Sequence, residues 1–266
     1  MPKLSIITIN INDAEGVEKT IRSVIAQTFA DFEYIVIDGG STDNSVNVIK
    51  KYADKISFWV SELDTGIYNA MNKGILKASG EYCQFLNSGD MLATPDVTEQ
   101  MLKNMPKCSI LYGNMIKKVK GNVIIDRGFK GKLITLMDMF DGTINHSSAY
   151  IKRDLFDKYG LYDETLKIVS DWKFFFIAVG LNNEMVAYRD IEVTVFDMNG
   201  ISNIQRDLII KERKYVIEKL FNENILADLK EWNFFREICR RMSKYSFIWF
   251  LIKSTNFVLK KLEGNS

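Results

Sequence analysis

Four short apolar runs in the first ninety residues are each followed by amide or carboxylate side chains. The runs span 4–9, 34–37, 56–60 and 82–86, and the groups that follow them are Asn10 and Asn12, Asp38, Glu62 and Asp64, and Asn87 to Asp90. In an open α/β sheet, ligands bind outside the carboxyl ends of the strands. We therefore interpret these groups as one site rather than four unrelated turns.

Two of these carboxylates suit particular partners. Asp38 opens the glycine turn Gly39–Gly40, where its oxygens can accept a hydrogen bond from the N–H of a base such as uracil. Asp90 offers a hard oxygen ligand for Mg²⁺ or Mn²⁺, and such a cation would clamp a diphosphate. Each acid also has a structural alternative, which is to cap the helix that follows it.

The counts of histidine and cysteine exclude several chemistries. His146 is the only histidine, so a three-histidine zinc site and an HExxH site are impossible, and acid–base work falls on carboxylates or on His146. The three cysteines form no metal motif and no disulfide framework, which favours a reducing, cytoplasmic location. G-x-G-x-x-G, P-loop and G-x-S-x-G motifs are absent, which disfavours dinucleotide-binding domains, P-loop nucleotidases and serine hydrolases.

Length and composition indicate a globular protein. The chain has 266 residues, of which 47% are hydrophobic and 26% charged, enough to bury a full core and to exclude wholesale disorder. One enlarged α/β domain, or a core with an appendage, fits this length. The formal net charge of +1 argues against a globally basic nucleic-acid binder.

The elements that must position these side chains change along the chain. In the first hundred residues, apolar runs alternate with helical stripes, which predicts a parallel sheet with helices on both faces. After residue 110 the pattern becomes irregular, and after 200 only helical stripes remain. We expect short strands over 110–112, 115–119, 123–127, 147–151, 184–188 and 192–196, a hairpin turn at 121–122, and a helix over 171–179.

Several motifs together carry a resemblance. They are Leu4 to Thr8 with Asn10, Tyr34 to Asp43, Ser61 to Gly74, Gly80 to Tyr82 and Phe85 to Asp90, followed more faintly by His146 to Ser148 and Ser170 to Trp172. In this order they resemble the inverting family-2 nucleotide-sugar glycosyltransferases with the GT-A fold. The match is specific as a set over about residues 3–92, continues to about 200, and leaves the C-terminal part uncovered.

The resemblance implies a role for each matching residue. Nucleotide contacts would come from Thr8, Asn10, Asp38, Gly39, Asp64, Tyr68, Asn72, Lys73, Ser88 and Gly89, with Lys73 able to reach phosphate. The segment Asn87 to Asp90 stands where the family has an Asp-x-Asp metal motif, commonly Asp-Ser-Asp-Asp. Here it reads Asn-Ser-Gly-Asp, so only the metal-binding Asp90 is kept. This difference predicts weaker metal binding or a further ligand.

Three residues of the second half complete the implied site. Asp171 matches the family's catalytic base, which removes the proton of the acceptor hydroxyl; an N-cap role is its alternative. His146 is the candidate second ligand of the metal, or else a structural hydrogen-bonding residue. Trp172 is a candidate for stacking on the acceptor sugar, and packing is its alternative.

The C-terminal segment differs in charge from the rest. Residues 205–266 contain 13 Lys/Arg and 8 Asp/Glu, a net charge of +5, which leaves −4 for residues 1–204. Basic residues mix with aromatic ones here: Lys230, Arg236, Arg240, Arg241, Lys244, Lys253, Lys260 and Lys261 with Trp232, Phe234, Phe235, Phe247, Trp249, Phe250 and Phe257. This mixture suits an interfacial helix on anionic lipid, while packing on the core or on a homodimer partner is the alternative. No apolar run is long enough to span a membrane.

The sequence thus predicts a GT-A α/β domain over 1–204 and a helical extension over 205–266. The expected reaction is metal-dependent, inverting transfer of a sugar from a nucleotide-diphosphate donor, UDP-linked, to a hydroxyl of a glycan or lipid-linked acceptor. This activity belongs to polysaccharide synthesis in the cytoplasm, with peripheral contact at the inner face of the membrane and no nucleic-acid partner. A sugar nucleotidyltransferase and a non-catalytic nucleotide-sugar binding module are the alternatives.

Overall fold

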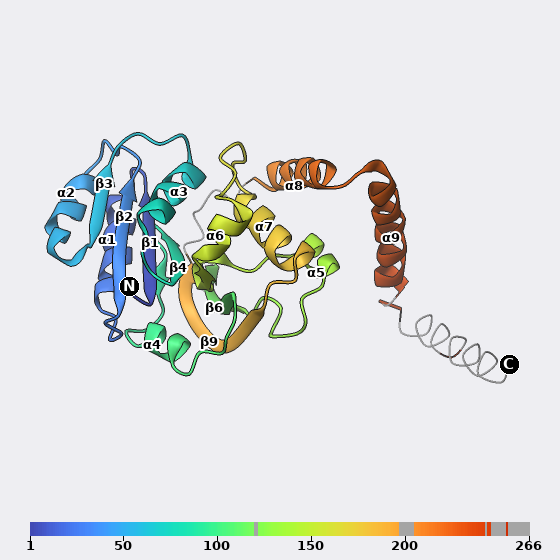
Figure 1. The fold of residues 1–266 in the computed structure, drawn as a ribbon, viewed down its shortest axis with the longest axis horizontal. Coiled ribbons are helices and arrows are strands. Elements are labelled where there is room, and N and C mark those ends of the chain that lie inside the picture. Colours follow the sequence, from blue (N-terminus) through green and yellow to red (C-terminus); the bar gives the residue numbers. More distant parts are fainter. Residues whose placement is uncertain (120–121, 197–204, 243, 246–253, 255–266) are drawn as a thin grey trace. The chain divides into compact units, whose positions relative to one another are not determined.

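A computed structural model describes residues 1–119, 122–196, 205–242, 244–245 and 254 (Figure 1). The chain divides into two compact units, residues 1–212 and 213–266. The predicted boundary at 204 adjoins residues outside the described ranges and stays a prediction. The turn at 121–122 and the tail beyond 245 also fall largely outside them.

The first unit is a mixed α/β structure built on one sheet. Its strands are β1 (Leu4–Asn10), β2 (Phe32–Asp38), β3 (Phe58–Ser61), β4 (Tyr82–Asn87), β5 (Met91–Leu92), β6 (Ile110–Val119), β7 (Asn122–Asp126), β8 (Ala149–Lys152) and β9 (Val186–Phe196). Among the described residues the strand order is β3-β2-β1-β4-β8-β6-β9-β5, and β7 pairs with β6.

Helices of three kinds surround or follow the sheet. The α-helices are α1 (Ala14–Ile25), α2 (Ser45–Lys51), α3 (Ile67–Lys77), α4 (Val97–Leu102), α5 (Leu136–Asp141), α6 (Asp154–Tyr159), α7 (Ser170–Phe175), α8 (Arg206–Leu220) and α9 (Glu223–Met242). Two 3₁₀ turns, η1 (Ala53–Lys55) and η2 (His146–Ser148), and a π-helical turn, η3 (Phe176–Leu181), complete the set.

The predicted parallel sheet is present in the first four strands. β3, β2, β1 and β4 pair in parallel, and the register aligns Asn10 with Asp38, Asp38 with Ser61, and Ile9 with Asn87. The carboxyl ends of these strands therefore lie at one level. Beyond β4 the sheet is mixed, because β8 is antiparallel to both β4 and β6, while β6 and β9 are parallel.

Both faces of the parallel part are covered, because side chains alternate along each strand. Leu4 and Ile6 of β1 belong to one core cluster with Val17 and Ile21 of α1. On the opposite face, α3 packs against β1, and a Cβ on Gly74 would lie 2.4 Å from Cγ2 of Ile7. Glycine at 74 thus permits the close approach of α3.

The second half differs from expectation at three places. The predicted strand pairs 110–112/115–119 and 184–188/192–196 are two continuous strands, β6 and the long curved β9 (Figure 1). A Cβ on Gly113 would lie 2.5 Å from Cγ2 of Val193, so glycine allows the irregular, closely paired β6–β9 ladder. The strand predicted over 147–151 begins only at Ala149, after η2.

The helical prediction after residue 200 holds for the described residues, which form α8 and α9. None of the described helices is both long enough and apolar enough to cross a membrane.

Candidate active site

The carboxyl ends of β1 and β2 meet at a buried amide–carboxylate pair. Asp38 has no exposed surface, and its oxygens accept hydrogen bonds from the Asn10 amide at 2.7 Å and from the hydroxyls of Ser41 and Ser61, both at 2.6 Å. Burial raises the pKa of Asp38, but these hydrogen bonds outweigh it and hold the pKa below the ordinary value. Asp38 is thus an anion that fixes Asn10 and the glycine turn.

The glycine turn after β2 brings a second acid and two apolar side chains together. A Cβ on Gly39 would lie 2.3 Å from Oδ2 of Asp64 and 3.4 Å from Ile11, so a larger residue at 39 would require the Asp64 carboxylate to move. Gly40 has a φ of +80° and lies against Leu63. Ile11 and Leu63 are 51% and 84% exposed, so both present apolar surface beside this polar turn.

The turn after β4 carries the residual metal motif. Gly89 adopts a φ of +92°, and its N–H donates to the Thr20 hydroxyl at 3.0 Å. The N–H of Ser88 donates to the Ile9 carbonyl, so this turn is anchored on β1. Asp90 follows with 1% of its surface exposed. A glycine at 89 meets the left-handed backbone that this turn requires.

Tyr68, His146 and Asp171 converge from three separate elements. The Tyr68 hydroxyl of α3 donates to Oδ1 of Asp171 at 2.9 Å, and Nδ1 of His146 lies 3.0 Å from Oδ2. The His146 and Asp171 side chains are 19% and 15% exposed. Burial raises the pKa of Asp171, but hydrogen bonding and charge from His146 and the Tyr68 bond hold the pKa below its usual range.

The pKa of His146 shifts in the opposite direction to that of Asp171. Burial lowers its pKa, but the hydrogen bond and charge of Asp171, together with the charge of Asp90, raise the pKa above the ordinary value. The charge of Asp90 thus acts on His146 in the same direction as that of Asp171. Nε2 of His146 is buried and has no hydrogen-bond partner within the described part of the chain.

Aromatic packing supports this convergence. The rings of Tyr68 and Tyr162 are 5.6 Å apart, and those of Phe156 and Phe174 are stacked at 4.6 Å. Phe85 of β4 contacts both Phe156 and Tyr162. The cluster joins α3, β4, α6 and α7, so Tyr68 and the helix that carries Asp171 rest on a common apolar base.

Other predicted site residues have hydrogen-bond partners within the protein. Thr8 has no exposed surface and its hydroxyl accepts a hydrogen bond from Tyr34. Trp172 is 2% exposed and its indole N–H donates to the Met139 carbonyl at 2.7 Å, so packing, the alternative to sugar stacking, describes its place.

Asn72 and Lys73 are also engaged within the protein. The Asn72 amide donates to the Tyr162 carbonyl and to Glu164, both at 2.8 Å, which ties α3 to the loop before α7. The Lys73 ammonium lies 2.8 Å from Glu62 and 3.0 Å from the Leu63 carbonyl. Reaching phosphate would require Lys73 to leave these partners.

Comparison with known proteins identifies the family. The model of the family described as "Glycosyl transferase family 2" matches residues 5–160, more than half of the chain. An uncharacterized glycosyltransferase of Mycobacterium tuberculosis is 34% identical over 209 residues, covering 76% of this chain and 78% of that one. The chain belongs to glycosyl transferase family 2.

Another relative and two solved structures are also similar to this chain. A "PGL/p-HBAD biosynthesis glycosyltransferase" of Mycobacterium bovis is 26% identical, covering 79% of this chain and 82% of its own. Staphylococcus aureus TarS 1–349, solved with UDP, has a TM-score of 0.62 at 22% identity, covering 73% of this chain and 60% of TarS 1–349. A Pyrobaculum calidifontis mannosyltransferase solved with GDP-Man and Mn²⁺ has a TM-score of 0.58 at 17% identity, covering 73% of this chain and 56% of that one. The expected GT-A-type fold is confirmed. Membership of glycosyl transferase family 2 favours sugar transfer over the alternative reaction, nucleotidyl transfer.

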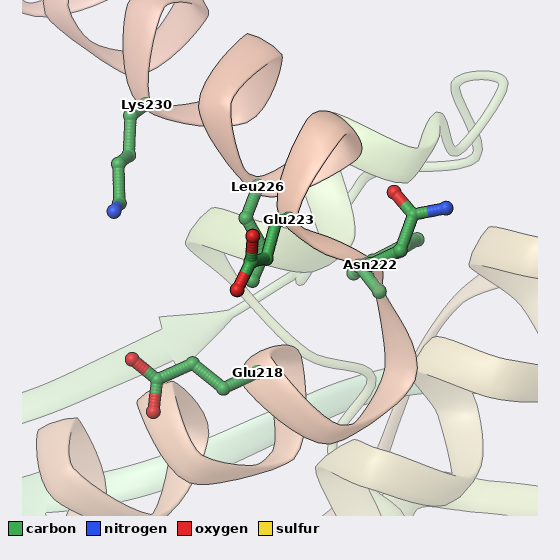
Figure 2. Close-up of a pocket in the computed structure, with 6 residues that line it drawn as sticks. Glu218, Asn222, Glu223, Leu226 and Lys230 are labelled. Carbon is green, nitrogen blue, oxygen red and sulfur yellow. The ribbon is translucent and has the colours of Figure 1, made fainter.

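Sequence reasoning missed several residues of the site. In the sequence, Ile11 and Leu63 are marked only by being apolar residues within polar turns. Glu164 and Glu212 are ordinary acids in the sequence, and only the fold reveals their partners. Glu164 lies on the loop before α7 and accepts from Asn72 of α3, whereas Glu212 of α8 accepts from backbone N–H groups of that loop. Within the second unit, a separate depression lies where α8 meets α9, with Glu218 and Lys230 extending toward the same space (Figure 2). None of its lining residues was among the predicted site residues.

Proposed function

We propose that the protein is an inverting glycosyltransferase that uses a nucleotide-diphosphate sugar, UDP-linked, and a hydroxyl acceptor. The observation that carries this proposal is the convergence of Tyr68 and His146 on Asp171, with the charge of Asp90 acting on His146. Buried polar atoms without partners in the described structure, Asn10 Oδ1, Asn87 Oδ1 and His146 Nε2, add acceptors that a bound ligand would satisfy.

Asp171 is proposed to be the catalytic base. The acceptor oxygen attacks the anomeric carbon while the bond from that carbon to the diphosphate oxygen breaks, and the nucleoside diphosphate leaves with the electron pair. Asp171 takes the hydroxyl proton as the new glycosidic bond forms. The lowered pKa of Asp171 keeps it ionised at neutral pH, and the side-chain bonds from Tyr68 and His146 fall on different carboxylate oxygens, each of which has two lone pairs.

Asp90 and His146 fit a divalent cation, Mn²⁺ or Mg²⁺. Asp90 supplies a buried carboxylate, and Nε2 of His146 is a buried nitrogen without a hydrogen-bond partner in the described part of the chain. A metal-bound histidine commonly donates its other N–H to a carboxylate, the role that Asp171 plays toward Nδ1. Among the described residues no cluster of three or more His, Cys, Asp or Glu suits a metal, so diphosphate and water oxygens would complete the shell. Such a cation supplies electrostatic stabilisation of the leaving diphosphate.

The ends of β1 to β3 are proposed to hold the nucleotide. Asn10, Gly39 and Asp64 form the polar part of this pocket, fixed by Asp38, and exposed Ile11 and Leu63 offer apolar surface to the base. The uridine nucleotide is proposed by analogy with TarS, which is solved with UDP and with UDP-GlcNAc, while the Pyrobaculum calidifontis mannosyltransferase of similar fold is solved with GDP-Man. Tyr68, Asn72, Lys73, Ser88 and Gly89 remain proposed neighbours of the nucleotide.

The acceptor is proposed to be a glycan or a lipid-linked sugar, used at the cytoplasmic face of a membrane. Described residues of α9 support this: Trp232, Phe234 and Phe235 are 54%, 63% and 52% exposed, and Arg240 and Arg241 lie on the same helix. Exposed aromatic and basic side chains on one helix suit an anionic lipid surface.

Replacing Asp171 by Asn tests the base. We expect transfer to fall about 100- to 10,000-fold, the range that general-base catalysis contributes, while UDP binding stays close to wild type. Product analysis with a panel of nucleotide sugars, each screened by thermal shift with and without Mn²⁺, measures the donor and the reaction. Full activity of Asp171→Asn would contradict the base assignment. UDP binding without turnover of any donor would instead indicate a binding module.

A further inference from the structure

Glu212 of α8 is a buried carboxylate that binds three successive backbone N–H groups. Its side chain belongs to a residue only 8% exposed. Oε1 accepts from the Lys167 N–H at 2.7 Å, and Oε2 accepts from Ile168 and Val169 at 3.0 and 3.3 Å. Burying a carboxylate is costly unless hydrogen bonds replace water, and these three donors do so. Three consecutive N–H groups reach one carboxylate only while 167–169 keeps one turn conformation.

The clamped turn leads directly into the helix that carries Asp171. The Val169 carbonyl accepts the first helical hydrogen bond of α7, from the Lys173 N–H at 2.8 Å. Ser170 accepts a hydrogen bond from the Asp163 N–H, and Lys173 pairs with Asp163 at 2.6 Å. A shift of Val169 would therefore be passed to the first turn of α7.

We propose that Glu212 is a positioning residue for the transfer reaction. By fixing 167–169, its carboxylate sets the direction in which Asp171 meets Tyr68, His146 and the acceptor. The proposal rests on the proposed role of Asp171 as base. It gives the first turns of α8 a part in the reaction although Glu212 touches neither substrate nor metal. Misplacing a reacting group by about 1 Å can cost about 100-fold in rate.

The substitution Glu212→Gln tests this role. Glutamine keeps the length of the side chain but turns one acceptor oxygen into an NH₂ group that must face an N–H donor. We expect kcat to fall about 10- to 100-fold, while KM for the donor changes less than about two-fold, because the donor pocket lies on other elements. Glu212→Asp keeps both oxygens and should recover part of kcat. Amide hydrogen exchange at 167–169 should be faster in Glu212→Gln.

Glu218→Gln is the matched control on the same helix. Glu218 is 54% exposed, pairs with Lys214 at 3.8 Å and lines the depression in Figure 2, so kcat should stay at the wild-type value. A folded Glu212→Gln protein with wild-type kcat, or with unchanged exchange at 167–169, would overturn the proposal. If the wild-type protein transfers no sugar, the proposed function fails and the catalytic part of this role fails with it. The exchange measurement then still reports whether the Glu212 carboxylate fixes the backbone of 167–169.

Discussion

Asp171 binds Tyr68 through one carboxylate oxygen and His146 through the other. The contact with Asp171 is compatible with two functions of His146. If Nε2 of His146 binds a metal, Asp171 both removes the acceptor proton and orients a metal ligand. If His146 only donates a hydrogen bond, its effect is confined to the orientation and pKa of Asp171. The two possibilities make different predictions about metal affinity.

We expect His146→Gln to weaken Mn²⁺ binding in the presence of UDP by at least about 10- to 100-fold, the loss typical of mutating a residue that only orients a metal ligand. Calorimetric titration of Mn²⁺ into the UDP-bound protein measures this affinity. Tyr68→Phe is the control, because it removes the other hydrogen bond to Asp171 and leaves both proposed ligands in place. Equal Mn²⁺ affinity in His146→Gln and wild type would show that His146 does not bind the metal and acts only through its contact with Asp171.

At the scale of elements, Glu184 joins α6 to the segments that lead into β6 and β9. Its carboxylate is 13% exposed, binds Lys158 and Tyr159 of α6, both at 2.6 Å, and accepts from Ser109. Burial raises the pKa of Glu184, but these partners outweigh it and lower the pKa to about 2. Because the folded-state pKa lies below the unfolded value, the stabilisation is present above about pH 4.5 and is lost as pH falls toward 2.

Glu184→Gln should therefore lower the free energy of unfolding by about 1–3 kcal/mol at pH 7 and by progressively less as pH falls below about 4.5. Urea unfolding at several pH values measures this difference. Asp54→Asn provides an exposed comparison, because the Asp54 side chain is 70% exposed and pairs only loosely with Lys55, at 3.4 Å. If the loss in free energy of unfolding caused by Glu184→Gln stays constant from pH 7 to pH 3, the lowered pKa of Glu184 is contradicted.

The sequence predicted elements whose cause is local. Apolar runs such as Leu4 to Ile9, bounded by polar turns, marked the four parallel strands and the edge where they end. The sequence did not predict that 110–119 is one strand, because the irregularity at Gly113 depends on contact with β9. It also did not reveal the Tyr68–Asp171 bond, which joins residues 103 apart, or the Glu212 clamp. Such contacts are products of tertiary packing and leave no local pattern.

For the whole molecule, the contrast in charge between residues 1–204 and 205–266 predicts how the enzyme reaches its acceptor. Sequence charges of −4 and +5 separate the catalytic part from the extension, and α9 exposes Trp232, Phe234 and Phe235. Near an anionic surface each Lys or Arg contributes about 1 kcal/mol, and salt screens this attraction. We expect the full chain to bind vesicles containing phosphatidylglycerol and to bind neutral phosphatidylcholine vesicles weakly.

Vesicle sedimentation at low and high salt measures this binding. The double substitution Trp232→Ser/Phe235→Ser should reduce it about ten-fold or more, because two large apolar side chains no longer enter the interface. Leu133→Ser is the matched control, since Leu133 is 81% exposed but belongs to the first unit. Binding that ignores both lipid charge and the double substitution would contradict a membrane role. A mass that doubles with protein concentration, and returns to the monomer in the double variant, would show instead that α9 serves a second copy of the chain.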